Sequence, residues 1–423
     1  MGALSIGVVM ALGGCTTSPD AGAAPSEPAA GTAFVGSATP ADTARATAAA
    51  TDLLRARAAA VVAGDEQAYA DTVADRTTAA GRRQLDSFTA ARALRVSRLE
   101  VGEPVVDVDA AEPQRARAEA DLRYRVDDLD RGDRVARLEY DLVRSGAGWQ
   151  VEAERPVGPG ATAPWVAMPT LRVERTEHGV VAGTVPAARL AEHLAVVDRA
   201  VPGLREQWDG TPARVLVLAP ATVAEADALL GRPSGSGAAP VAATTEGPTG
   251  ADGRATGDRV VLDPTAFDRL TASGREVVLT HELAHVAVRA SVPGRAAAWL
   301  AEGYADHVGY VKADVSTRRL VAPLVSAIRT GHGPRALPSA SDLQPASGDI
   351  EVPYLAAWQA VEVIAREHGE AALRRLVAAG SSTGSDADAE AATDVALASV
   401  LGTTRADLTR QWLDHLGDLA SAG

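Results

Sequence analysis

The spacing of apolar residues changes from helical to strand-like within the first third of the chain. Between Ala41 and Gly64, four apolar residues fall on one face of a predicted helix. The four are Leu54, Ala58, Val61 and Val62. Residues 116–126 alternate strictly between apolar and polar, and the alternation returns at Leu138 and again at Trp149. This order predicts helices followed by an antiparallel meander of three strands, with the strand charges on a solvated face.

The second half of the chain mixes strands with helices. Strands are expected at residues 180–184, 214–220 and 259–262. After the first of them, a helical face contains Leu190, Leu194, Val197 and Val201. Residues 233–257 are rich in Gly, Ser, Thr and Pro, and within them residues 241–244 could form an edge strand. A surface loop is an equal alternative for the Gly-rich part.

Polar residues interrupt an apolar helical pattern at 277–288, where His281, Glu282 and His285 occur together. Histidines four residues apart lie on one face of a helix, so both imidazoles can reach a single ion. Glu282 would lie beside that ion and could take a proton from a metal-bound water. The pattern therefore predicts a zinc hydrolase site; the alternative is a chance match on an ordinary helix.

A catalytic zinc usually has three protein ligands and an open position for water. Glu302 is the expected third ligand, because Pro293 and Gly294 would turn the chain back and set a second helical segment against the first. Asp306 lies four residues beyond Glu302 and therefore on the same face. It could accept the second ring N–H of a ligand histidine and fix the tautomer.

The pattern H-E-x-x-H at residues 281–285, followed by W-L-x-E-G-x-A-D at residues 299–306, resembles the gluzincin metallopeptidases, in particular bacterial members with an aminopeptidase-like catalytic domain. The resemblance implies a gluzincin domain over residues 165–423, with a mixed sheet and a mainly helical half around the zinc. By motif position it implies the zinc ligands His281, His285 and Glu302, the catalytic base Glu282, and the acid behind a ligand, Asp306. The G-x-M-E-N stretch of the aminopeptidases is absent from the sequence, so aminopeptidase activity is not implied.

Two further features follow from the same resemblance. Gluzincins of this kind have a tyrosine downstream of the zinc motif that donates to the oxyanion of the tetrahedral intermediate. Tyr354, which opens a predicted helix ending at Gly369, is the candidate, and its alternative role is that of an amphipathic helix-start residue. His332, in a Gly-rich loop, is the second candidate. Gluzincins also pair the substrate backbone with an edge strand beside the zinc, which makes residues 241–244 the expected substrate wall.

Residues 41–156 resemble the NTF2-like, cone-shaped α+β fold in having helices followed by a long antiparallel meander. Such a domain could hold a ligand in the cone or serve as a packing and interaction module. Its polar residues show no catalytic spacing, so a non-catalytic role is expected. Residues 155–160 have the composition of a linker to the second domain.

Residues 1–15 have the features of a lipoprotein signal peptide. The apolar run at 3–14 is too short for a permanent transmembrane helix, and the segment ending in Cys15 resembles a lipobox. Residues 16–40 would be a flexible tether. No Lys or Arg precedes the apolar run, which a truncated start would explain, and the alternative is a buried cysteine. The expected location is the extracytoplasmic face of the cell membrane, through a lipid on Cys15.

Composition narrows the possible partners. The net charge is -14 and the arginines are interleaved with acids, which argues against a nucleic-acid partner. Cys15 is the single cysteine, so an internal disulfide is excluded. A length of 423 residues suggests two or three domains and predicts no particular oligomeric state.

These features together predict a membrane-anchored, extracytoplasmic, Zn2+-dependent peptidase that hydrolyses peptide bonds of a peptide or protein substrate through a zinc-activated water. The alternative is a catalytically silent lipoprotein that binds a partner or ligand through its NTF2-like domain.

Overall fold

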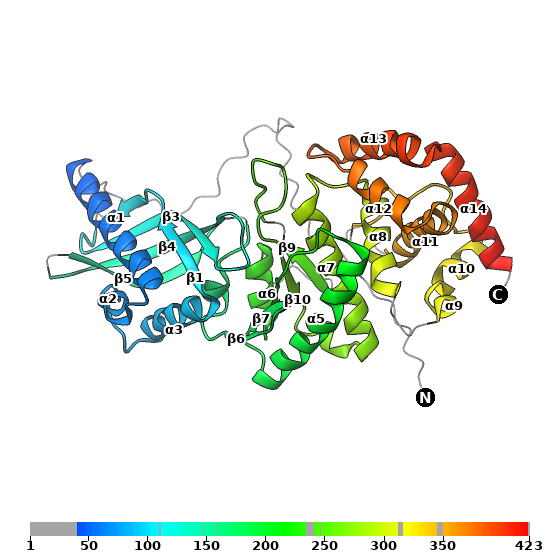
Figure 1. Ribbon diagram of the computed structural model, residues 1–423. Coiled ribbons are helices and arrows are strands. Elements are labelled where there is room, and N and C mark those ends of the chain that lie inside the picture. The colour runs from blue at the N-terminus through cyan, green and yellow to red at the C-terminus, as the bar shows by residue number, and fades with distance from the viewer. Residues whose placement is uncertain are drawn as a thin grey trace. The chain divides into compact units, whose positions relative to one another are not determined.

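The computed structural model describes residues 40–421, except 110, 147, 159, 234–240, 246, 312–315 and 345–349. The described chain forms two compact units, the first ending at Val173 but including residues 227–233, and the second containing the remainder (Figure 1). The predicted signal peptide, Cys15 and nearly all of the tether lie outside the described residues. Each helix in the described ranges is too short or too polar to cross a bilayer.

The first unit packs helices on an antiparallel sheet. Its elements are α1 (Pro40–Ala63), α2 (Glu66–Asp71), α3 (Ala79–Leu94), β1 (Val96–Val101), β2 (Val105–Val108), β3 (Arg115–Val126), β4 (Arg134–Ser145), β5 (Gly148–Pro156) and α4 (Pro164–Ala167). The strand order is β1-β3-β4-β5, and β2 pairs with the same edge of β3 as β1 does. Helix α1 crosses the sheet at β1 and β2 (Figure 1). The predicted first helix and the three-stranded meander are confirmed.

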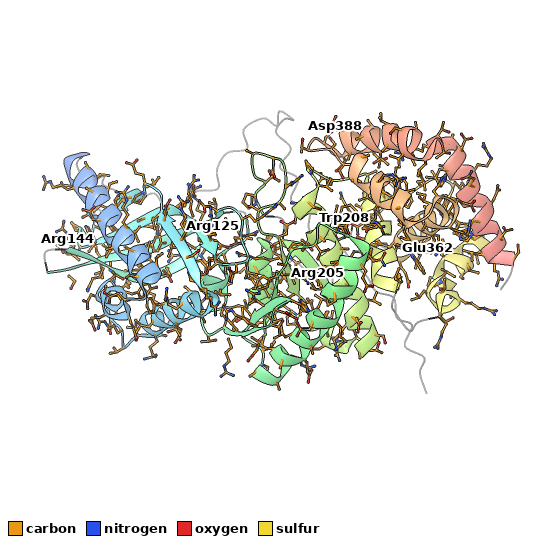
Figure 2. The ribbon with its side chains drawn as sticks, in the orientation of Figure 1. Arg125, Arg144, Arg205, Trp208, Glu362 and Asp388 are labelled. Carbon is orange, nitrogen blue, oxygen red and sulfur yellow. The ribbon has the colours of Figure 1, made fainter. Side chains whose placement is uncertain are left out.

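Alternation along β3 separates a core face from a charged face. Every even-numbered residue from Ala116 to Val126 is buried, while the charged residues at the odd-numbered positions point to the other side of the sheet. On the charged face, carboxylates of neighbouring strands or turns pair with the arginines, as in the hydrogen bond of 2.9 Å that Arg125 (labelled in Figure 2) donates to Asp133. The strand charges therefore lie on the predicted solvated face, and the structure adds that they are paired.

Strands β1 and β2 and the start of the linker differ from what the sequence pattern predicts. The structure adds strands β1 and β2, whose burial does not alternate cleanly and which form through pairing with β3. The predicted linker at residues 155–160 begins too early, because Arg155 and Pro156 belong to β5. Arg155 pairs with Asp141 and Glu139 on β4, and a proline is tolerated at the end of this edge strand.

The second unit joins a mixed sheet to a set of helices. Its sheet-forming half contains β7 (Gly179–Gly183), α5 (Ala187–Gln207), β8 (Val215–Ala219), β9 (Ala242–Thr245) and β10 (Arg259–Leu262), together with the parts of β6 (Arg172–Arg175) and α6 (Val223–Leu230) that follow Val173 and precede Asp227. The strand order is β6-β7-β8-β10-β9, in which β7, β8 and β10 are parallel and β9 is an antiparallel edge strand. The predicted strands, the helix after the first of them and the edge strand are all confirmed.

The helical half begins with the two helices that carry the H-E-x-x-H motif and Glu302. Its elements are α7 (Ala272–Ser291), α8 (Ala298–Val311), α9 (Thr317–Leu320), α10 (Ala322–Arg329), α11 (Glu351–His368), α12 (Glu370–Ala379), α13 (Asp386–Ala396), a π-helical turn (Leu397–Leu401) and α14 (Arg405–Ser421). Helix α7 packs against α5, α8 and β9, so its central residues are buried (Figure 1). The fold class is therefore mixed α and β, with one antiparallel and one mixed sheet.

Helices α8 and α11 approach unusually closely beside Glu302. A Cβ atom at Gly303 would lie 2.5 Å from the main-chain oxygen of Ala357, so glycine is needed at this crossing. The close crossing brings the first turns of α11, with Tyr354, toward the part of α8 that carries Glu302.

Candidate metal centre

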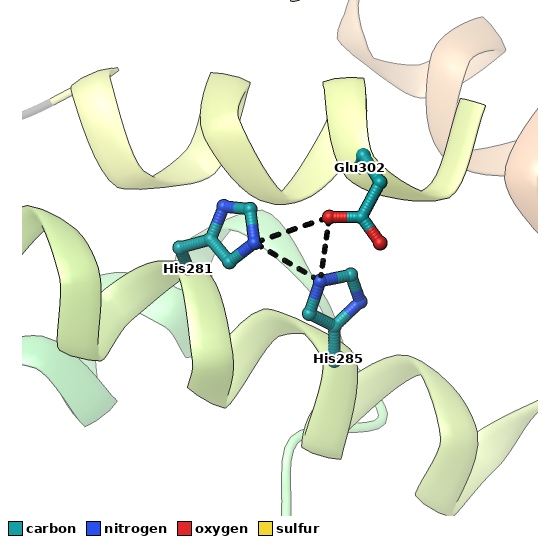
Figure 3. Close-up of side chains that lie close together, drawn as sticks. All are labelled: His281, His285 and Glu302. Carbon is teal, nitrogen blue, oxygen red and sulfur yellow. Dashed lines mark hydrogen bonds and ion pairs between the residues drawn. The ribbon is translucent and has the colours of Figure 1, made fainter. Parts of the chain in front are cut away.

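Helix α7 presents both histidines of the motif to one point. The helix begins at Thr271, whose side chain accepts a hydrogen bond from the Gly274 N–H at 3.1 Å. One turn apart in the buried middle of the helix, His281 and His285 turn their Nε2 atoms toward each other at 3.1 Å (Figure 3). Helical spacing alone therefore supplies two nitrogen ligands.

Helix α8 supplies the third ligand from the opposite side. Glu302 Oε2 lies 3.4 Å from His281 Nε2 and 3.5 Å from His285 Nε2 (Figure 3). One ligand atom from each of the three residues lies within 4.8 Å of the others. All three side chains are buried, with Glu302 only 3% exposed. The structure thus brings together the three residues that the sequence predicts as ligands.

Asp306 lies behind His281, as predicted. The Nδ1–H of His281 donates to Asp306 Oδ1 at 2.9 Å, and both side chains are buried. This hydrogen bond holds the ring so that Nε2 points at His285 and Glu302. An acid in this position also makes the imidazole a stronger ligand.

The chemistry of the three ligand residues fits a cation. Burial would raise the pKa of Glu302, but the two imidazoles outweigh it and lower the pKa to about 2, so the carboxylate is ionised. Its Oε2 is buried without a hydrogen-bond partner, although two ring nitrogens face it. A cation at this point would satisfy that oxygen and both nitrogens. Two imidazoles and one carboxylate suit zinc and related transition ions.

Protonation of the metal-free site supports the same conclusion. Burial lowers the pKa of His281, but Asp306 and Glu302 outweigh burial and raise it to about 10. A ligating imidazole must give up the proton on its metal-facing nitrogen. A bound cation would therefore take the place of a proton that the carboxylates already stabilise.

Glu282 lies one position round the helix from His281 and is fully buried. Burial raises the pKa of its carboxyl, an effect that the two histidines and a hydrogen bond from Thr244 oppose. Thr244 Oγ1 lies 2.8 Å from Glu282 Oε2. A carboxyl group with a raised pKa, beside a metal but outside its ligand set, can exchange protons with a bound water.

Of the two candidate oxyanion donors, Tyr354 reaches the metal centre. Its side chain is buried and lies close to the carboxylate of Glu302. Burial and the nearby carboxylates hold the pKa of Tyr354 far above its ordinary value, so the hydroxyl keeps its proton. His332 is exposed, and its Nδ1 lies 3.3 Å from Thr330 Oγ1 instead.

The sequence pattern assigns no role to the side chain of Thr244, although it predicts the strand that carries it. Ala242, Ala243, Thr244 and Thr245 are all buried, so this edge strand lies inside the unit. The one feature of the sequence that could have pointed to a role for Thr244 is a hydroxyl group within a short run of small residues. Its contact with Glu282 depends on tertiary packing between β9 and α7.

Comparisons with known proteins do not place the chain in a family: no family model matches it, and no curated protein matches it significantly. What the site can do therefore follows from its own side chains.

Proposed function

We propose that this chain is a zinc-dependent peptidase whose metal is held by His281, His285 and Glu302. The observation that carries the proposal is the convergence of these three ligand atoms beside a buried glutamate, Glu282. Two imidazoles and one carboxylate form the protein ligand set of many catalytic zinc sites, with a further position open. When bound, zinc would polarise a peptide carbonyl and lower the pKa of a bound water toward neutrality.

The remaining side chains have defined tasks in this proposal. Glu282 takes the proton of the attacking water and passes it to the leaving amine, for which a carboxyl with a raised pKa is suited. Asp306 holds His281 in its ligand orientation. Tyr354, which keeps its proton, donates a hydrogen bond to the oxyanion of the tetrahedral intermediate.

An extended peptide is the substrate class that the surrounding elements favour. Strand β9 is the last strand of its sheet and lies against α7, next to Glu282. The residues of β9 are buried, so a peptide would extend the sheet at that edge by main-chain hydrogen bonds only by displacing what covers the strand, which would set its scissile bond beside the metal. The proposal covers peptide or protein substrates without choosing between them.

The family and location stay within the proposal. A mixed sheet with an antiparallel edge strand, followed by two motif-bearing helices, supports a gluzincin-like domain. Helices followed by an antiparallel sheet support an NTF2-like first unit. The sequence around Cys15 supports a lipid anchor on the extracytoplasmic face of the cell membrane.

The decisive experiment compares the wild-type protein with Glu282→Gln. We expect one zinc per chain in both, and chelator-sensitive cleavage of a peptide library by the wild type alone, with the variant slower by about 10²–10⁴-fold. Glu276→Gln is the matched control, because Glu276 is on the same helix but pairs with Arg199 at 3.2 Å. Full cleavage by Glu282→Gln would refute the mechanism. Zinc without cleavage in the wild type would favour a silent binding lipoprotein.

A further inference from the structure

We infer that the Thr244 hydroxyl positions the Glu282 carboxylate for proton transfer. This inference rests on the proposed peptidase function and adds a positioning residue to it. Thr244 itself would touch neither the metal nor the reacting atoms.

The contact geometry identifies the hydroxyl as a donor to the carboxylate. Thr244 Oγ1 lies 2.8 Å from Glu282 Oε2 and 3.3 Å from the main-chain oxygen of Glu282. A threonine hydroxyl has one proton, and the shorter contact to the charged acceptor is the stronger hydrogen bond. Within the described ranges, this is the one hydrogen bond that the Glu282 carboxylate receives.

A glutamate next to a metal ligand needs such an anchor. Its long side chain has several rotamers, and the nearby imidazoles of His281 and His285 attract its negative charge. Without a fixed partner, the carboxylate could swing toward the ion and become a ligand. The hydrogen bond to Oε2 holds one oxygen and leaves Oε1 as the oxygen that exchanges protons with the water.

Thr244 is itself held rigidly. It is 2% exposed and lies within β9, where it pairs in register with Val260 of β10. The same strand is the proposed binding edge for the substrate backbone. A peptide that adds to β9 would therefore bind to the strand that also holds the Glu282 carboxylate. Strand β9 would then align the scissile bond with the catalytic base.

Two substitutions separate the hydroxyl from the shape of the side chain. Thr244→Val keeps the branched shape and removes the hydroxyl, whereas Thr244→Ser keeps the hydroxyl. For Thr244→Val we expect kcat to fall about 10- to 100-fold while KM stays within about twofold and zinc content is unchanged. Thr244→Ser should restore kcat to within about threefold of wild type. Equal losses in both variants, or no loss in Thr244→Val, would overturn the inference.

A second readout does not depend on activity. Crystal structures of the full-length variants should show the Glu282 carboxylate displaced in Thr244→Val and in its wild-type position in Thr244→Ser. Thr245→Val is the structural control, because the Thr245 hydroxyl lies 3.4 Å from the main-chain oxygen of Arg259 and the change should leave Glu282 in place. If the wild type cleaves peptides but the Glu282 carboxylate has not moved in Thr244→Val, this inference alone would be overturned. A wild type that cleaves no peptide would instead overturn the proposed function.

Discussion

Asp306 accepts the Nδ1 proton of His281 at 2.9 Å from a position one helical turn beyond Glu302. Helix α8 would therefore supply both a metal ligand and the group that orients a ligand on the facing helix. The two contributions are separable, because Asp306 lies behind His281 and does not belong to the three ligand residues.

Removing Asp306 should weaken metal binding without abolishing it. In Asp306→Ala the ligands remain, but the His281 ring loses its orienting acceptor, so we expect zinc affinity to fall about 10- to 100-fold. Competition with a chromogenic chelator measures this directly. Asp394→Ala is the control, because Asp394 forms an exposed pair with Arg405 on the C-terminal helices. An unchanged affinity in Asp306→Ala would contradict the orienting role.

Tyr354→Phe should separate catalysis from metal binding. Loss of one oxyanion donor typically lowers kcat by about 10²–10³-fold, and the variant should keep one zinc per chain. Tyr304→Phe offers a matched control, since the Tyr304 hydroxyl donates to the main-chain oxygen of Gln207 at 3.2 Å instead. Comparable kcat values for Tyr354→Phe and wild type would assign Tyr354 a packing role.

His307 should make stability depend on pH. Its Nδ1 lies 2.7 Å from Glu362 Oε1, and its Nε2 lies 3.1 Å from both carboxylate oxygens of Glu370 (Glu362 is labelled in Figure 2). Burial lowers the pKa of His307, but the two carboxylates outweigh it and raise the pKa above 6.5. The Trp358 indole N–H also donates to Glu362, and the Tyr304 ring stacks on His307.

The sign follows from the raised pKa. Because the folded state holds the His307 proton more tightly, its stabilisation is complete below the unfolded pKa near 6.5 and is lost as pH rises through the folded value. Melting temperatures of wild type and His307→Gln, measured between about pH 6 and about pH 9, should converge as pH rises. Parallel curves would show that the carboxylates do not hold a proton on His307.

Gly303→Ala should destabilise the second unit. The new Cβ would lie 2.5 Å from the Ala357 main-chain oxygen, and separating α8 from α11 should cost about 1–3 kcal/mol of unfolding free energy. Gly417→Ala is the control, because a Cβ there meets no atom within 4 Å and α14 should gain about 0.5–1 kcal/mol. Denaturant unfolding of both variants tests the difference, and equal stabilities would show that the helices can move apart freely.

Local spacing explains what the sequence could predict. The pitch of α7 places His281 and His285 on one face of that helix. Glu302 and Asp306 lie on one face of α8, which follows after the chain turns back. These residues lie within one helix or on two consecutive helices, so their positions can be predicted from the spacing of side chains along the sequence. Strand β9 was one of two interpretations that the sequence of its region allowed, and the structure confirms the strand.

Tertiary packing explains the rest. The Thr244 contact with Glu282 depends on how β9 lies against α7, and the Tyr354 contact with Glu302 depends on the crossing at Gly303. Strands β1 and β2 likewise form by pairing with β3 and have little alternation of their own. Neither kind of contact leaves a periodic trace in the sequence.

The separation along the chain has a consequence for folding. His281 and Asp306 are 25 residues apart and lie on consecutive helices, so closing the loop between them has a small entropic penalty. Thr244 and Glu282 are 38 residues apart, and their contact also requires the parallel sheet, whose non-local pairing forms slowly. We therefore expect α7 and α8 to pack together earlier in folding than β9 docks against α7 and fixes the Glu282 carboxylate.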